Sequence, residues 1–195
     1  MVRILVVNNY PARKGSETLE KCVGGNGATV VHAEWDEVSV AKFDSCDGVV
    51  LSGSPALLTD KTTPAKYRKE IDAMTDSRVP IMGVCFGHQL MAHAFGAEVV
   101  KDGRHVTRMV KTTVLADDPL FEGLPRSLML RESRYEVVKS LPEGFNLLAK
   151  SETSRIAAMK HPARPLYGAQ FHPEAYTKAN PEGNRVVGNF VHMLR

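Results

Sequence analysis

The sequence predicts an α/β fold: a doubly wound, mostly parallel open sheet with flanking helices and a smaller antiparallel section in its second half. In the first half, short apolar runs of strand length alternate with segments that carry apolar residues at helical spacing. These runs do not alternate with polar residues, as expected for strands buried on both faces. After residue 96 the pattern changes to short strand candidates separated by Pro and Gly.

Capping residues place the helices of the first half. Ser16 is a candidate N-cap, and Thr63 is another, with Pro64 at the first helical position. Gly96 stands where a helix-ending glycine belongs. The glycine-rich stretch 24–27 is a helix stop and turn, because a strand rather than a helix follows it. Strands are expected at 3–7, 29–33, 48–52 and 80–84, and helices at 16–23, 39–43, 63–75 and 86–95.

The second half ends with a helix that Asn180 caps and Pro181 starts, running to Leu194. Residues 161–165, with two prolines, form a hairpin-like loop. No repeat, linker or low-complexity segment divides the chain, so a single domain over 1–195 is expected. Strands are expected at 98–101, 106–115, 127–130, 136–138, 146–150, 156–160 and 166–171.

The composition argues against several classes of function. The net charge of +3 is too small to predict a nucleic-acid partner. No apolar run is long enough to span a membrane, and the chain starts directly with a strand rather than a signal peptide. Three cysteines without a CxxC pair suit a reducing compartment, so a cytoplasmic location is expected, with Cys22 and Cys46 as thiols without a role. No metal site is expected, because no histidines or cysteines have zinc spacing.

The stretch 80–96 organises the chain. Its centre, GVCFG at 83–87, places Cys85 between two glycines at a strand-to-helix junction. This is the pattern of a nucleophile elbow, where a sharp turn exposes a reactive side chain. The positive end of a helix dipole favours the thiolate form of a cysteine at this position. A lone cysteine is more often a buried apolar residue, but the two glycines in register favour a nucleophile.

A nucleophilic thiol needs a base and a group that orients the base. His172 follows the strand expected at 166–171, and Glu174 lies two residues further on. In an extended segment these two side chains share a face, and Pro173 keeps the segment out of a helix. The carboxylate can then bind one ring nitrogen while the other faces the thiol. On its own, such a His-Pro-Glu run is often a surface turn.

Together, GVCFGHQ around Cys85 and FHPE around His172 resemble the triad class of glutamine amidotransferases, class I, as does the turn LSGSP at 51–55. The similarity covers nearly the whole chain. Within this class, the stretches 141–145 and 167–174 most resemble glutaminase subunits of GMP synthases. The resemblance implies the class I amidotransferase fold, which is flavodoxin-like, and L-glutamine as substrate without a cofactor.

The resemblance also implies roles for single residues. Cys85 would attack the side-chain amide of glutamine, with His172 moving the proton and Glu174 orienting His172. The oxyanion would be held by the backbone N–H of Phe86 and by one from the Gly53–Ser54 turn. Other substrate contacts would come from Gln89, Ser133, Arg134 and Tyr135.

Two positions depart from the family pattern. Ser54 replaces a second glycine of the turn, which is acceptable if its φ is negative, since only a backbone N–H is needed. In the stretch 130–137, Glu132-Ser133 replaces the Ser-His of the synthases; this loop normally lines the glutamine pocket and faces the synthase.

The resemblance implies that a separate ATP-using synthase subunit receives the ammonia, since no phosphate-binding motif for activating an acceptor is present. Three alternatives stay open: a stand-alone γ-glutamyl hydrolase, a Cys-elbow peptidase or stress protein, and a non-catalytic binding module. Basic residues on the strands of the second half either are solvated or form a docking surface. These residues are Arg104, Arg108, Lys111, Arg131 and Arg134.

Overall fold

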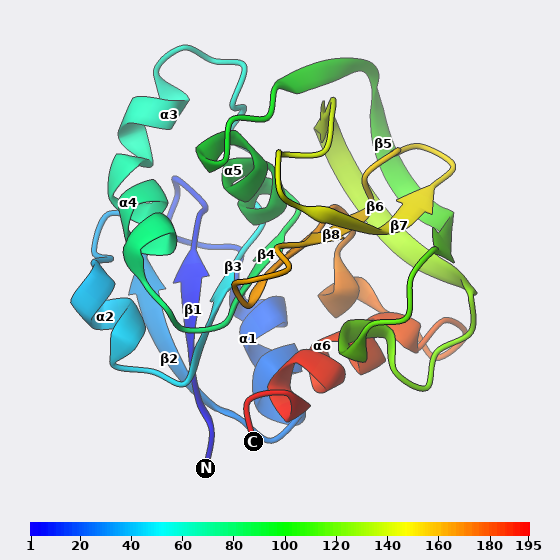
Figure 1. Cartoon of the computed structure of the whole chain (residues 1–195), viewed down its shortest axis with the longest axis horizontal. Helices are drawn as coiled ribbons and strands as arrows, with labels where there is room; N and C mark the ends of the chain where they lie inside the picture. Colours follow the sequence, from blue (N-terminus) through cyan, green and yellow to red (C-terminus); the bar gives the residue numbers. More distant parts are fainter.

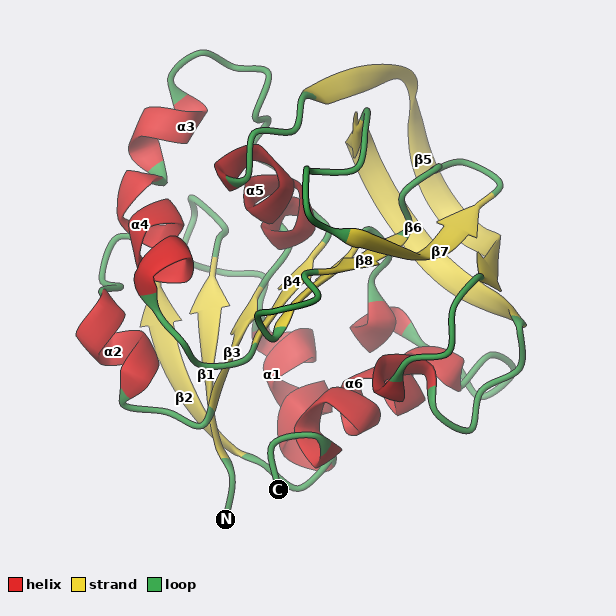
Figure 2. Cartoon of the chain, in the orientation of Figure 1, coloured by secondary structure: helices red, strands yellow, loops and turns green.

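The computed structural model describes residues 1–195 apart from the side chain of Arg104. Figures 1 and 2 show a sheet with helices on both sides, extended by a strongly curved section of long strands. The strands are β1 (Arg3–Asn8), β2 (Thr29–Glu34), β3 (Gly48–Leu51), β4 (Ile81–Val84), β5 (Val99–Val114), β6 (Ser127–Val138), β7 (Asn146–Ser151), β8 (Ala158–Lys160) and β9 (Leu166–Ala169). The helices are α1 (Glu17–Gly25), α2 (Val40–Asp44), α3 (Thr63–Lys66), α4 (Arg68–Asp76), α5 (Phe86–Ala94) and α6 (Glu182–His192), with 3-10 turns η1 (Pro119–Phe121) and η2 (Pro173–Ala175).

The sheet has two parts. Over the described backbone, its nine strands follow the order β2-β1-β3-β4-β9-β8-β7-β5-β6. The pairs from β2 to β9 are parallel, and those from β9 to β6 are antiparallel. The parallel part has the 2-1-3-4-5 order of flavodoxin-like folds, in which ligands bind beyond the carboxyl ends of the strands. The predicted fold class is therefore confirmed.

The buried strands explain why the sheet needs helices on both faces. Successive side chains of a strand point to opposite faces, so an uninterrupted apolar strand forms two cores. Ile4 and Val6 pack with residues of α1 and α6, whereas Leu5 and Val7 pack with residues of α2, α4 and α5. Figure 1 shows α1 and α6 on one side of the sheet and α2, α4 and α5 on the other. Among the described residues, no helix is long and apolar enough to cross a membrane.

Several boundaries differ from the sequence predictions. The single helix expected at 63–75 is two helices, α3 and α4, divided at Tyr67, and its N-cap is Thr62 instead of Thr63. Tyr67 is fully buried and its hydroxyl donates to the carbonyl of Asn9 at 2.6 Å, which accounts for the interruption. The N-cap of α6 is Pro181 rather than Asn180. Ser16 stands at the N-cap of α1, but its hydroxyl binds Glu20 and no backbone N–H.

The second half has fewer and longer strands than predicted. The candidates at 98–101 and 106–115 belong to one strand, β5, whose pairing with β6 shifts register between Lys101 and Val106. The candidates at 127–130 and 136–138 are likewise joined in β6. The charged residues between them do not end the strand, because Glu132, Arg134 and Glu136 are buried and paired.

Candidate active site

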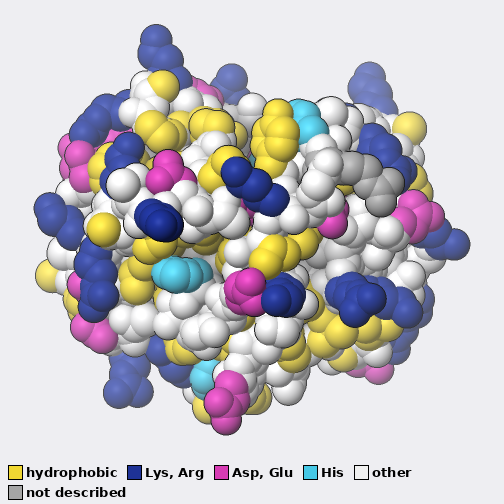
Figure 3. Space-filling model, turned by 90° about the horizontal axis from the view of Figure 1, so that it is seen from above, with side chains coloured by type: hydrophobic (Ala, Val, Ile, Leu, Met, Phe, Trp, Pro, Cys, Tyr) yellow, Lys and Arg dark blue, Asp and Glu magenta, His cyan; other side chains and the backbone are white. Residues whose placement is uncertain are grey.

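The parallel strands bring the predicted site residues to one edge of the sheet. Cys85 follows β4, the Gly53–Ser54 turn follows β3, and His172 lies just beyond β9. Figure 3 shows the face of the molecule above these strand ends, where hydrophobic and histidine side chains lie among scattered Lys and Arg. Segments separated by more than a hundred residues in the sequence, 53–54 and 172–174, therefore meet here.

Cys85 forms a strained turn between β4 and α5. Its φ of 50° and ψ of −99° are unusual for a residue with a side chain, and such conformations concentrate at functional sites. The two flanking glycines are needed for close packing, not for a positive φ. A Cβ at Gly83 would lie 2.5 Å from the carbonyl oxygen of Gly87, and one at Gly87 would lie 2.7 Å from that of Leu51. The elbow geometry predicted from the sequence is present.

Cys85 is only 4% exposed, and its sulfur has two polar neighbours. Its Sγ lies 3.5 Å from the carbonyl oxygen of Ser133 and 3.8 Å from Nε2 of Gln170. Gln170 is fully buried, and its Oε1 accepts a hydrogen bond from Gln89. The sulfur is thus held in a small polar environment built by β6 and the segment that follows β9.

His172 and Glu174 interact as predicted. His172 Nδ1 lies 2.7 Å from Oε1 of Glu174, which leaves Nε2 of the ring with no partner among the described side chains. Burial lowers the pKa of His172, but the charges of Cys85 and Glu174 outweigh it and raise the pKa well above its ordinary value. A protonated imidazole beside the sulfur is the arrangement that activates a cysteine nucleophile.

The predicted oxyanion turn packs directly against His172. A Cβ at Gly53 would lie 2.9 Å from Cε1 of His172 and 3.7 Å from Cβ of Cys85. The φ of Ser54 is not positive, so the backbone of this turn can hold serine in place of glycine, as expected. The N–H of Phe86, at the first position of α5, has no acceptor within the helix. Phe86 and the Gly53–Ser54 turn both adjoin Cys85, and their role as an oxyanion hole stays a prediction.

A cavity of about 240 Å³ opens beside Cys85 and His172. Its wall includes the predicted residues Ser54, Gln89 and Tyr135, together with Ser133 and Arg134. Gln89 is buried, and its Nε2 donates to the Glu136 carbonyl at 2.8 Å. The Arg134 guanidinium is 1% exposed and paired with Glu132, so a substrate contact at this position would have to come from its backbone.

Four further residues lie at this site that were not predicted from the sequence: Gln170, Tyr10, His105 and Glu136. Tyr10 lines the same cavity as Cys85 and His172, and burial raises the pKa of its hydroxyl. His105 stacks on Tyr135 with ring centroids 4.0 Å apart, and Glu136 binds the backbone of Leu58 at 2.7 Å. Gln170 lies within the family-like stretch 167–174, which could have pointed to it, and it reaches the sulfur of Cys85. The other three carry no local motif, because strand pairing and loop packing bring them to the pocket.

Comparisons with known proteins agree with this arrangement. The family model described as glutamine amidotransferase class-I matches residues 6–194. A protein of Archaeoglobus fulgidus, named as a glutamine-hydrolyzing subunit of GMP synthase, is 45% identical over 157 residues, which is 80% of each chain. The protein of the same name from Pyrococcus abyssi is 40% identical over 144 residues, 73% of each chain.

Solved structures give the same result. A putative GMP synthase subunit from Thermoplasma acidophilum superposes with a TM-score of 0.88 at 28% identity, covering 100% of this chain and 94% of that one. A glutamine amidotransferase from Thermotoga maritima, 18% identical, shares the fold, with a TM-score of 0.74 over 90% of this chain and 77% of that one. Because the family match spans nearly the whole sequence and the relatives are this similar, the chain belongs to the class I glutamine amidotransferases and is a glutamine-hydrolysing enzyme.

Proposed function

We propose that this chain is the glutaminase subunit of a two-subunit synthase of the GMP synthase type, passing ammonia from L-glutamine to a separate ATP-using subunit. The observation that carries the proposal is the His172–Glu174 pair, joined at 2.7 Å, beside a cysteine in a strained elbow at the wall of a pocket. The names of the relatives, which describe one subunit of GMP synthase, support the partner. The buried free thiols fit a reducing, cytoplasmic setting.

In the proposed reaction, the Cys85 thiolate attacks the side-chain amide carbon of glutamine. The resulting oxyanion is stabilised by the N–H groups of Phe86 and the Gly53–Ser54 turn, and loss of one such donor typically costs about 100- to 1,000-fold in rate. His172 gives its proton to the departing ammonia. The neutral imidazole then takes a proton from water, which attacks the glutamyl thioester and releases glutamate and the Cys85 thiol.

The other residues of the site orient His172 or bind the substrate. Glu174 orients His172 and stabilises its charged form. Gln89 and the backbone of Ser133 and Tyr135 form the wall against which the substrate would bind. The Gln89 amide nitrogen is already used by Glu136 and Gln170, so its oxygen is the group available to the substrate.

A longer relative also supports a partner that carries the synthase activity. The glutamine-hydrolyzing GMP synthase of Thermosipho africanus is 37% identical over 147 residues, which is 73% of this chain but only 26% of that protein. The remaining part of that relative is where an acceptor-activating unit would lie.

A surface around the pocket mouth is the natural docking site, because ammonia must leave there without escaping to solvent.

The docking surface predicted from basic residues needs one correction. Arg134 is buried and cannot contact a partner, whereas Arg108 on β5 is exposed and Arg131 on β6 is half-buried. The side chain of Arg104 lies outside the described residues. Association through such charges should weaken as salt increases.

The test is steady-state glutaminase activity of the purified chain, alone and with a GMP-synthase-type ATP-using subunit, ATP and its acceptor nucleotide. We expect low activity alone and a marked increase with the complete partner, reduced by salt. Cys85→Ser is the control that separates this chain's activity from a contaminant. High activity alone, unchanged by the partner, would favour a stand-alone γ-glutamyl hydrolase instead.

A further inference from the structure

One strand contacts both halves of the site. The carbonyl of Arg131 in β6 accepts the backbone N–H of His172 at 2.7 Å. Two residues further on, the carbonyl of Ser133 lies 3.5 Å from Cys85 Sγ. The relative position of the base and the sulfur therefore depends on where residues 131–133 of β6 lie.

The side chains between these contact points are buried and charged. Glu132 is fully buried, and its carboxylate accepts hydrogen bonds from Ser151 Oγ at 2.6 Å and Thr153 Oγ1 at 2.7 Å. Arg134 Nε donates to the same carboxylate at 2.9 Å. Every oxygen of the Glu132 carboxylate is thus paired, as a buried charge requires.

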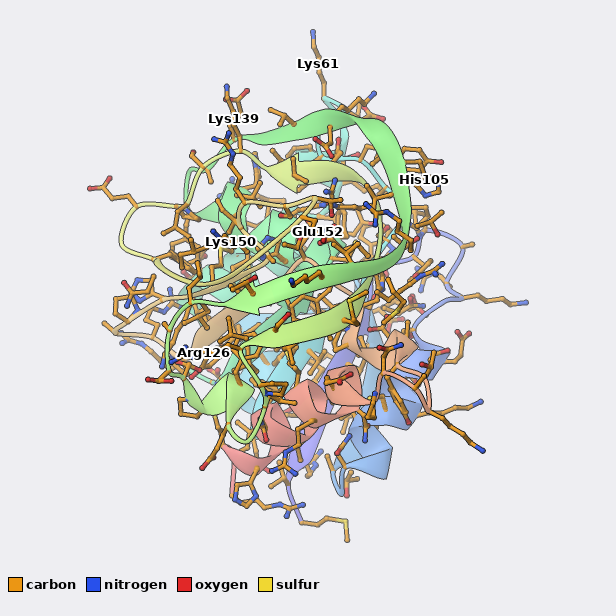
Figure 4. The ribbon with its side chains drawn as sticks, turned by 90° about the vertical axis from the view of Figure 1, so that its right-hand side faces the viewer. Lys61, His105, Arg126, Lys139, Lys150 and Glu152 are labelled. Carbon is orange, nitrogen blue, oxygen red and sulfur yellow. The ribbon has the colours of Figure 1, made fainter. Side chains whose placement is uncertain are left out.

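Arg134 extends this network to two further segments. Its Nη1 donates to Asp102 Oδ2 at 3.1 Å, and its Nη2 donates to the carbonyl of Thr153. One guanidinium therefore joins β5, β6 and the loop after β7, and lysine could not reach three acceptors in different directions. Figure 4 shows the long β5 and β6 ribbons side by side on this face, with Glu152 near the centre and His105 at the bend of β5.

β6 is an edge strand, so β5 is its one strand neighbour over the described backbone. Residues 131–133 pair in register with residues 107–109 of β5. The β5–β6 register shifts just beyond them, between Lys101 and Val106, and the first pair after the shift is Val106 with Arg134. Side-chain bonds from Glu132 and Arg134 thus add a constraint to an edge strand next to an irregular part of its ladder.

We propose that Glu132 and Arg134 are positioning residues that fix residues 131–133 of β6 and thereby the placement of His172 relative to Cys85. This inference rests on the proposed catalytic pair, but it concerns residues that do not touch the reacting atoms. It assigns a role to Glu132-Ser133, the position at which this chain departs from the synthases it resembles. A misplacement of about 1 Å can lower a rate by about 100-fold, so a shift of this strand would be costly to catalysis.

The test compares Glu132→Gln, Arg134→Lys and Arg134→Met with a matched control, Lys139→Met. Lys139 also forms an ion pair next to β6, with Glu98 at 2.7 Å, but both side chains are about 60% exposed. Two quantities are measured: kcat and KM for glutamine with the partner subunit, and the rate of Cys85 alkylation by iodoacetamide across pH. Near-UV circular dichroism identifies the variants that are folded.

We expect the three network variants to lose about tenfold or more in kcat and to shift the pH profile of alkylation, while Lys139→Met stays within about twofold of the wild type. Arg134→Lys should retain more activity than Arg134→Met. If the Arg134 variants do not fold, Ser151→Ala removes one 2.6 Å bond to Glu132 from a half-buried hydroxyl and should lower kcat severalfold. Folded variants with a wild-type kcat and alkylation profile would overturn the proposal.

Alkylation of Cys85 needs neither glutamine turnover nor a partner. An inactive wild type with a normal alkylation profile would therefore count against the proposed function alone. A change of profile in Glu132→Gln would still support the positioning role in that case.

Discussion

Replacing Glu70 by glutamine should change how the stability of the protein depends on pH. Glu70 lies in α4 and is fully buried. Its Oε1 accepts a hydrogen bond from Asn9 Nδ2 at 3.1 Å, and its Oε2 has no partner among the described residues. Burial raises the pKa of Glu70 from 4.5 to about 8, against a smaller lowering by Asn9. At pH 7 the folded protein therefore keeps this carboxyl protonated, whereas the unfolded chain ionises it.

The magnitude follows from the two pKa values. Below pH 4.5 Glu70 is protonated in both the folded and the unfolded state, so it does not make stability depend on pH. As pH rises from 4.5 toward 8, the unfolded chain ionises Glu70 while the folded protein does not, and the free energy of unfolding falls. Between pH 4.5 and 7 the loss is about 2.5 × 1.36, or about 3 kcal/mol. Glutamine does not titrate. The free energy of unfolding of the Glu70→Gln variant should therefore rise by about 3 kcal/mol relative to the wild type over this interval.

The assay is urea denaturation of both proteins at pH 5 and pH 7.5, followed by the fluorescence of Trp35. This tryptophan packs against Tyr67 at the start of α4, with ring centroids 4.9 Å apart. Comparing differences at two pH values cancels any constant effect of the unpaired glutamine amide. Glu143→Gln, at an exposed carboxyl, is the control. A wild-type-minus-variant difference that does not change with pH would refute the reasoning.

Other substitutions test the site itself. Cys85→Ser should abolish glutamine hydrolysis and leave glutamine binding by calorimetry largely intact; turnover within about tenfold of the wild type would contradict the nucleophile role. His172→Ala should be nearly inactive in the same assay and Glu174→Gln less impaired, whereas equal inactivity would mean that Glu174 itself does chemistry. Gly53→Ala should lower kcat, because its Cβ would lie 2.9 Å from His172 Cε1; an unchanged kcat would show that the turn can move.

The parallel half of the fold is predictable because its information is local. Strands such as residues 48–51 are apolar throughout, and a buried position on both faces follows directly. The elbow around Cys85 is a compact motif, and the His172–Glu174 pair needs only the geometry of an extended segment. Each of these predictions depends on neighbours in the sequence.

The second half is less predictable because its pattern depends on partners elsewhere. The run of charges in β6 reads as a loop or a solvated surface, yet Arg134 is buried because Asp102 and the loop at 151–153 supply its partners. Tyr67 likewise ends α3 through a hydrogen bond to Asn9, 58 residues away. Contacts of this kind, made by residues far away in the sequence, allow a charged or polar side chain to be buried where its type alone predicts exposure.

The register of two neighbouring strands sets the position of Cys85 relative to His172, the proposed nucleophile and base. Val84 pairs with Ala169 in the β4–β9 ladder, and the N–H of Cys85 donates to the carbonyl of Ala169 at 2.8 Å. His172 follows three residues later, so both reactive side chains leave the sheet from adjacent strand ends. A slip of one residue would move His172 by about 3.3 Å along the strand and reverse the face of every side chain in it. The buried apolar faces of β9 forbid that slip, because each is matched to its own core. The hydrophobic pattern of the last strand thus also sets how Cys85 and His172, the proposed catalytic pair, lie relative to each other.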